Sequence, residues 1–200
     1  MTFSIFNSQF SIVNDRLVGH GVIYLDCVKN TQVIAGPDMI ILHYTAGVSA
    51  ASSADYLVRP EVKASAHLVI GRDGRIFQLV PFHVEAWHAG RSRYTGREGL
   101  NRFSIGIELD NLGRLRLEAG KFRAECNRIV APEEVYADCS AGELSYWHAY
   151  TAVQVGVLER IVRLLRKHYP IRYVVGHSDI TPRKSDPGLA LKYVELFLNV

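Results

Sequence analysis

The chain has 200 residues, of which 48% are hydrophobic and 22% are charged, and its formal net charge at pH 7 is +3. This length and composition are typical of a globular protein and allow a full hydrophobic core without disulfides or a structural metal. The Lys and Arg residues are scattered along the chain without a long basic run, which argues against a dedicated nucleic-acid surface.

Cysteine usage and the N-terminal segment bear on the cellular compartment. Cys27, Cys126 and Cys139 form no CxxC pair, and we interpret them as free thiols in a reducing compartment. Residues 1–15 lack the basic segment and long apolar run of a secretory signal. No apolar stretch approaches the roughly 20 residues that a membrane span needs. We therefore expect a cytoplasmic protein, with signal-independent export or phage-borne release as alternatives, and the oligomeric state stays open.

Short apolar runs alternate with helical patterns, which predicts a layered α/β fold, and the absence of repeats and linkers predicts a single domain over residues 1–200. A strand is expected at 39–43, and it is apolar on both faces, as a central strand should be. A helix is expected at 49–58, where several serines can serve as N-caps. Residues 66–70 and 75–80 flank the turn Gly71-Arg72-Asp73-Gly74, which predicts a hairpin.

The second half of the chain begins with a strand predicted at 104–109, where Ile105, Ile107 and Leu109 share one face. Residues 111–147 have the least regular pattern and are expected to form a long excursion. A helix should follow from a capping box made by Thr151 and Gln154 and should stop before Pro170. The last expected strand, 171–175, leads directly into Gly176-His177.

Two histidines lie at the ends of apolar strands, His43 and His177, where a rigid scaffold can present a metal ligand. Taken singly, each is more typical of a hydrogen-bonded histidine at a sheet edge than of a metal ligand, so a metal site needs a third ligand. Asp186 is the candidate, because Pro187 favours an extended backbone before it. In an extended segment Lys184 and Asp186 point to the same side. From the spacing alone, a surface turn with a solvated Lys-Asp pair is the preferred interpretation.

Glu108 interrupts the otherwise apolar strand at 104–109. One interpretation is a sheet with a wet face, where the carboxylate meets water. The other is a functional carboxylate, which Gly106 favours because a glycine two residues earlier leaves open space beside Glu108. We interpret His67, on the neighbouring predicted strand, as a core residue or as a partner of a ligand rather than as a ligand itself.

Five segments resemble, in this order, those of the zinc-dependent N-acetylmuramoyl-L-alanine amidases: IILHYTAG, SAHLVIGRDGRIFQLVPF, AWHAGRS, SIGIELDN and VGHSDITPRKSDPG. That family shares its fold with peptidoglycan recognition proteins and certain phage lysozymes. The resemblance extends from about Met39 to Gly188 and leaves out the first 38 residues and the 111–147 excursion. It implies the same α/β fold: a single domain with a mixed central β-sheet flanked by helices.

The resemblance implies that His43, His177 and Asp186 hold one Zn²⁺ per chain and leave a coordination position open, as in catalytic zinc sites. It implies that Glu108 is the general base and that Lys184 stabilises the oxyanion. The reaction would be hydrolysis of the amide bond between N-acetylmuramic acid and L-alanine, in peptidoglycan or in muropeptides. Ala66 stands where phage relatives often carry tyrosine, and this places the chain closer to the bacterial recycling branch.

Two other functions are weighed against this enzyme. A recognition protein would bind peptidoglycan without cutting it, but such a chain typically lacks a ligand or the catalytic pair. A zinc protease of another class is disfavoured because the sequence has no HExxH. Whether the substrate is the intact sacculus or a soluble anhydro-muropeptide is not readable from the sequence.

One further hypothesis concerns specificity. The segment Trp87-His88-Ala89 is expected to line the cleft or to pack in the core. Four arginines follow it within a short polar stretch, and they are suited to bind the carboxylates of an acidic stem peptide. These arginines are Arg91, Arg93, Arg97 and Arg102. The alternative is a solvated loop.

Overall fold

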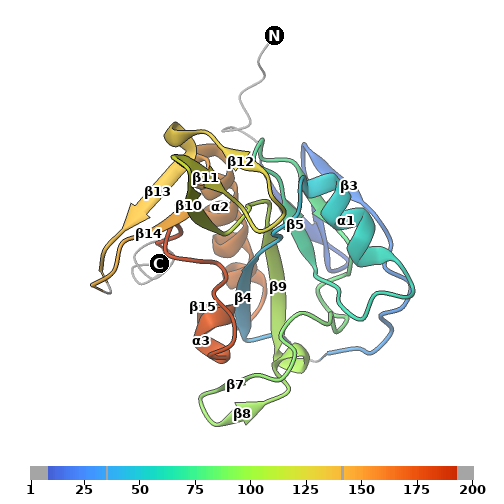
Figure 1. Cartoon of the computed structure of the whole chain (residues 1–200). Coiled ribbons are helices and arrows are strands. Elements are labelled where there is room, and N and C mark those ends of the chain that lie inside the picture. The colour runs from blue at the N-terminus through green and yellow to red at the C-terminus, as the bar shows by residue number, and fades with distance from the viewer. Residues whose placement is uncertain (1–8, 35, 141, 193–200) are drawn as a thin grey trace.

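The computed structural model describes residues 9–34, 36–140 and 142–192 and is built around a six-stranded mixed sheet (Figure 1). The strand order is β15-β4-β9-β5-β6-β3. Four neighbours, β15, β4, β9 and β5, run parallel, whereas β6 is antiparallel to β5 and β3 is parallel to β6. The strands are β3 Val22–Tyr24, β4 Met39–Tyr44, β5 Leu68–Ile70, β6 Ile76–Gln78, β9 Ser104–Leu109 and β15 Tyr173–Gly176.

The predicted α/β fold with a mixed central sheet is confirmed, and so are the strands around 39–43 and 104–109 and the hairpin of β5 and β6. The helix predicted at 49–58 is α1, Ala50–Val58, which begins at its N-cap Ser49. The hydroxyl of Ser49 accepts a hydrogen bond from the backbone N–H of Ser52 at 3.1 Å. Serine caps the helix because its oxygen pairs with one of the N–H groups that the first turn leaves free.

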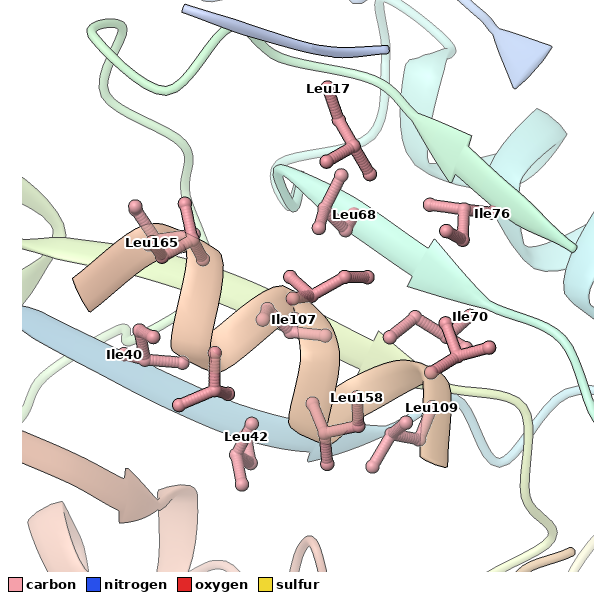
Figure 2. Packing of buried hydrophobic residues seen from close by; sticks show 14 of the residues in the cluster. Leu17, Ile40, Leu42, Leu68, Ile70, Ile76, Ile107, Leu109, Leu158 and Leu165 are labelled. Carbon is pink, nitrogen blue, oxygen red and sulfur yellow. The ribbon is translucent and has the colours of Figure 1, made fainter. Parts of the chain in front are cut away.

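The long helix α2, Ala152–His168, covers one face of the sheet. Its buried side chains include Val157, Leu158, Ile161, Val162 and Leu165. They pack against Ile40, Leu42, Ile107 and Leu109 of β4 and β9 and against β5 (Figure 2). Burying a side chain of this size contributes about 1.5–3 kcal/mol, so this layer dominates the stability of the domain.

The capping box predicted at the start of α2 is only partly present. Thr151 accepts a hydrogen bond from the backbone of Gln154, as an N-cap should. The Gln154 side chain does not complete the capping box, because it is buried and donates to the carbonyls of Ile70 and Asp110 at 2.9 and 3.1 Å. It therefore ties the first turn of α2 to the ends of the sheet strands.

Residues 111–147 are not the irregular excursion that was expected. They form a second, antiparallel sheet of five strands in the order β12-β11-β10-β14-β13, which lies beside the main sheet in Figure 1. Its small core contains Leu112, Leu115, Ala124 and Val130. Four of these strands have only two to four residues, too few to show a period-two pattern, whereas Arg114–Glu118 does alternate as Arg-Leu-Arg-Leu-Glu, a strand signal that the prediction overlooked. The strands are β10 Arg114–Glu118, β11 Lys121–Arg123, β12 Ile129–Val130, β13 Val135–Asp138 and β14 Ser145–His148.

The remaining elements are short. Two small hairpins stand apart from the sheets, β1 Ser11–Val13 with β2 Arg16–Val18, and β7 Arg93–Tyr94 with β8 Arg97–Glu98. Two 3-10 turns, Leu100–Phe103 and Pro132–Glu134, precede β9 and β13, and α3, His177–Ile180, follows β15 directly. None of the helices in the described part of the chain has both the length and the apolarity needed to cross a membrane.

Candidate active site

The parallel strands bring the predicted site residues into one row across the sheet, on the face opposite α2. His43 of β4 is the register partner of Glu108 of β9, and Leu42 is the partner of Gly176, which precedes His177. The row lies near the carboxyl ends of these strands, where the chain leaves the sheet and side chains can face a cleft rather than a packed layer.

His43, His177 and Asp186 converge on one point. Their donor atoms form a triangle, with 3.0 Å between the two histidine Nδ1 atoms and 2.9 Å from each Nδ1 to Asp186 Oδ2. All three residues are buried, and together they make a group that could hold a metal ion, which we call the donor group. Tetrahedral zinc with bonds of about 2.0–2.1 Å separates its ligand atoms by about 3.3 Å. The triangle would need to open by only a few tenths of an ångström.

Asp186 is held in place from both sides. Its backbone carbonyl accepts a hydrogen bond from the N–H of Ser178 in α3 at 2.9 Å. The carbonyl of the next residue, Pro187, accepts one from the hydroxyl of Tyr150 at 2.7 Å. Burial raises the pKa of Asp186, but hydrogen bonds with His177 and His43 outweigh it and hold the pKa below its ordinary value. The carboxylate is therefore charged, as a metal ligand must be.

Glu108 lies beside this group without a hydrogen-bond partner for its buried Oε2 among the described residues. Burial is the main cause that raises its pKa from 4.5 to about 8; the charge of Asp186 adds to the rise and Lys184 opposes it. The wet-face interpretation is wrong, because Ser104 and Gly106 on the same strand face are buried. A carboxyl group with a pKa near neutrality is suited to accept and return a proton.

The space beside Gly106 is not open, contrary to expectation. A Cβ atom at this position would lie 2.4–2.6 Å from three atoms of the His88 ring, so the glycine admits His88 rather than substrate. His88 is buried, and its Nδ1 lies 3.1 Å from Nε2 of His43. Of its neighbours, Ala89 is in the core and Trp87 is 38% exposed.

Lys184 has an exposed side chain, unlike Asp186 two residues later. Its charge nevertheless lowers the pKa of both Glu108 and His43, although burial has the larger effect on each. The ammonium group therefore lies within electrostatic reach of the site. An exposed position leaves it free to move toward a ligand.

Two cavities are lined by Glu108 or by segments close in sequence to the site residues. One, of about 330 Å³, is lined by Glu108 together with the β4–α1 loop and α1, including Thr45, Ser52 and Tyr56. The other, of about 570 Å³, is lined by residues 90–93, 98–99 and 180–183, which adjoin His88 in sequence or follow His177. Of these two cavities, only the smaller is lined by a residue of the predicted site, Glu108.

The four arginines do not act together as proposed from the sequence. Arg97 donates two hydrogen bonds of 3.0 Å to the carboxylate of Asp38 and lies over the ring of Phe103. Arg102 also lies over Phe103. Arg91 and Arg93 line the larger cavity, where Arg183 joins them. Only these two of the original four remain candidates for binding an acidic ligand.

Several residues near the site were not singled out from the sequence. Tyr150 was missed because a tyrosine before a helix is ordinary in any chain, and only the fold shows that its hydroxyl reaches Pro187. The same holds for Ser185, which hydrogen bonds to the hydroxyl of Tyr44 at 2.7 Å. His67 is buried, its Nδ1 accepts a hydrogen bond from Gly106, and it is not part of the donor group, in agreement with expectation.

Comparisons with known proteins identify the family of the chain. The family model for N-acetylmuramoyl-L-alanine amidase matches residues 33–189. The 1,6-anhydro-N-acetylmuramyl-L-alanine amidase AmpD of Escherichia coli is 38% identical over 135 residues, which cover 66% of this chain and 56% of AmpD. The N-acetylmuramoyl-L-alanine amidase AmiD of E. coli is 30% identical over 168 residues, 79% of this chain and 51% of AmiD. The chain thus spans about half the length of these curated relatives.

Solved structures have the same fold. A crystal structure of an AmpD derivative superposes with a TM-score of 0.63 at 25% identity and covers 94% of this chain and 98% of that one. The structure of E. coli AmiD in complex with anhydro-N-acetylmuramic acid-L-Ala-D-gamma-Glu-L-Lys gives a TM-score of 0.62 at 30% identity, with 82% of this chain and 57% of AmiD covered. With the family model matching most of its length, the chain belongs to the N-acetylmuramoyl-L-alanine amidase family.

Proposed function

We propose that this protein is a zinc-dependent amidase that hydrolyses the bond between N-acetylmuramic acid and L-alanine. The observation that carries the proposal is the convergence of His43, His177 and Asp186 beside the unpaired Oε2 of Glu108. A structural metal site would not need a carboxyl group with a raised pKa next to it, whereas a hydrolytic site does.

His43, His177 and Asp186 would hold the zinc ion. Two imidazole nitrogens and one carboxylate oxygen are a donor set that zinc accepts in catalytic sites. When bound, zinc supplies a Lewis acid that polarises the scissile carbonyl and makes water more acidic. His43 lies in β4, His177 begins α3 directly after β15, and the backbone of Asp186 accepts a hydrogen bond from Ser178 of α3, so these buried residues would need to move little when the metal enters.

Glu108 would move the proton. It would accept a proton from the attacking water and then deliver it to the departing nitrogen of L-alanine, and its raised pKa suits both steps. Lys184, exposed and within electrostatic reach, would approach the carbonyl oxygen as negative charge develops there. No serine or cysteine nucleophile is needed.

The proposed substrate class is a soluble muropeptide. The support is similarity: AmpD is named as a 1,6-anhydro-N-acetylmuramyl-L-alanine amidase, and AmiD was solved with an anhydro-N-acetylmuramic acid peptide as its substrate. The presence of Ala66 where phage relatives often carry tyrosine points the same way. Intact sacculus is the second candidate, and the experiment below includes it.

The test is product analysis by mass spectrometry after incubation of the zinc-loaded protein with anhydro-muropeptide or with whole sacculi. We expect release of a free peptide with an N-terminal L-alanine, loss of that release with a chelator, and recovery when zinc is restored. Asp186→Ala should be inactive, while the matched change Asp138→Ala, in the second sheet, should stay active. Binding of muropeptide without cleavage would instead support a recognition protein.

A further inference from the structure

A series of hydrogen bonds connects the backbone carbonyl of Leu100 to Nε2 of His43, the ring nitrogen that is not part of the donor group. The hydroxyl of Ser104 lies 2.7 Å from the carbonyl oxygen of Leu100 and 3.3 Å from Nε2 of His88. The other ring nitrogen of His88, Nδ1, lies 3.1 Å from Nε2 of His43. The series of hydrogen bonds therefore ends on the imidazole of His43, whose other nitrogen, Nδ1, belongs to the donor group.

The direction of each bond follows from the chemistry of the first one. A carbonyl oxygen only accepts, so the hydroxyl of Ser104 donates its proton to Leu100 and accepts from Nε2–H of His88. His88 is buried, and among the described residues its two ring nitrogens face the hydroxyl of Ser104 and the ring of His43 rather than a carboxylate that would stabilise a charged imidazolium, so the ring is neutral. A neutral ring with Nε2–H has an unprotonated Nδ1, which must accept from Nε2–H of His43.

This arrangement leaves the lone pair of His43 Nδ1 directed at the point where Nδ1 of His177 and Oδ2 of Asp186 converge, 3.0 and 2.9 Å away. In the opposite tautomer, with the proton on Nδ1, His43 could not bind a metal through that atom. The tautomer of His43 thus decides whether the site can bind metal. The His88 ring favours the tautomer with the proton on Nε2, which leaves Nδ1 free to bind.

The His88 ring is held firmly enough to do this. Its backbone N–H and that of Ala89 both donate to Oδ1 of Asn101, at 3.1 and 2.8 Å. One side of the ring packs against Gly106, where no side chain could fit. The rings of His43 and His88 meet edge to face at 80°, with 5.2 Å between centroids.

We propose that His88, oriented by Ser104, is a positioning residue that fixes the tautomer and ring orientation of His43 and so sets the metal affinity of the site. The inference rests on the proposed function only in its choice of zinc as the metal. Groups that orient a metal-ligating histidine typically change metal affinity by about 10–100-fold when removed.

The decisive variants are His88→Asn and His88→Leu, which have nearly the same size and shape. Both shorten the side chain equally beside Gly106, but only asparagine offers an oxygen near the position of Nδ1. The zinc dissociation constant is measured by competition with a chromophoric chelator. We expect His88→Leu to weaken binding by about 10–100-fold and His88→Asn to retain most of the affinity. Ser104→Ala should lie between them.

The same pair of changes at His67 is the control. His67 is also buried and its ring lies 5.9 Å from that of His88, but it hydrogen bonds to Gly106 and Val84 and not to the donor group. His67→Asn and His67→Leu should therefore not differ from each other in zinc affinity. Equal losses in the two His88 variants would mean that the ring only fills space and would overturn the proposal, as would full affinity in His88→Leu.

A second measurement does not depend on any variant folding. Long-range ¹H–¹⁵N spectra of the zinc-loaded wild-type protein should show His88 with its proton on Nε2 and an unprotonated Nδ1. A proton on Nδ1 of His88 would refute the series of hydrogen bonds. The zinc dissociation constants and the ¹H–¹⁵N spectra do not depend on turnover. If they agree with expectation but the protein cleaves no muropeptide, the proposed function is contradicted and the role of His88 still holds.

Discussion

Replacing Glu108 by glutamine removes one ionisable group and changes little else, so its effect on stability can be worked out from the structure. The folded-state pKa of Glu108 is about 8, against an ordinary value of 4.5. Because the pKa is raised, the folded protein binds more protons than the unfolded chain between these values, and stability falls as the pH rises through this window. At about 1.4 kcal/mol per pKa unit, the cost to the metal-free protein is under about 1 kcal/mol at pH 5 and roughly 4 kcal/mol at pH 8.

Glu108→Gln has no such cost. We therefore expect the metal-free variant to be more stable than wild type at pH 8 by roughly 3–4 kcal/mol, or about 6–16 °C in Tm for a protein of this size. At pH 5 the two should nearly coincide. Bound zinc would stabilise the carboxylate and reduce the difference. Turnover of the zinc-loaded variant should fall by about 10²–10⁴.

The assay is thermal unfolding at both pH values, with and without chelator, next to turnover on muropeptide. Glu133→Gln, at an exposed position in the second of the 3-10 turns, is the matched control and should change neither quantity. If the stabilisation were the same at pH 5 and pH 8, the carboxyl group would not be buried as described. If turnover fell less than about tenfold, another group would move the proton.

Three further predictions can be checked with the same protein. Asp186→Ala should lower bound zinc from near one per chain to a small fraction by metal analysis, and unchanged zinc would remove Asp186 from the site. Gly106→Ala should weaken zinc binding and lower Tm, because its Cβ would displace the His88 ring; an unaltered zinc dissociation constant would contradict this. Arg91→Ala and Arg93→Ala should raise KM for acidic stem peptides more than for amidated ones and leave zinc content unchanged, and equal KM values on both substrates would mean a solvated loop.

Local patterns were sufficient where a strand or helix carries its own signal. The apolar run Met39–Leu42 predicted a central strand, and the period-two pattern of Ser104–Leu109 predicted which face Glu108 would share with Gly106. Both follow from backbone geometry, which alternates side chains across a strand. The order of five short motifs was enough to predict the amidase family, which the family model confirms over residues 33–189.

Local patterns failed where the answer depended on a distant partner. The four-residue strand Ser145–His148 is too short to be recognised from its own pattern and becomes evident only when it pairs with β10. Arg97 resembles a ligand-binding arginine until Asp38 is found beside it. In each case the stabilising contact joins residues far apart in the chain, so no periodic pattern in the local sequence can predict it.

The sequence by itself determined the chemistry that is present: the histidines at two strand ends, the aspartate before a proline and the carboxylate within an apolar strand. Tertiary structure alone decided how these groups face one another. Parallel pairing of β4 with β9 and β15 places His43 beside Glu108 and next to His177, with His88 behind it in the space left by Gly106. The physical reason is that hydrogen bonding and metal binding depend on distances of about 3 Å between atoms, and only the packed fold sets such distances.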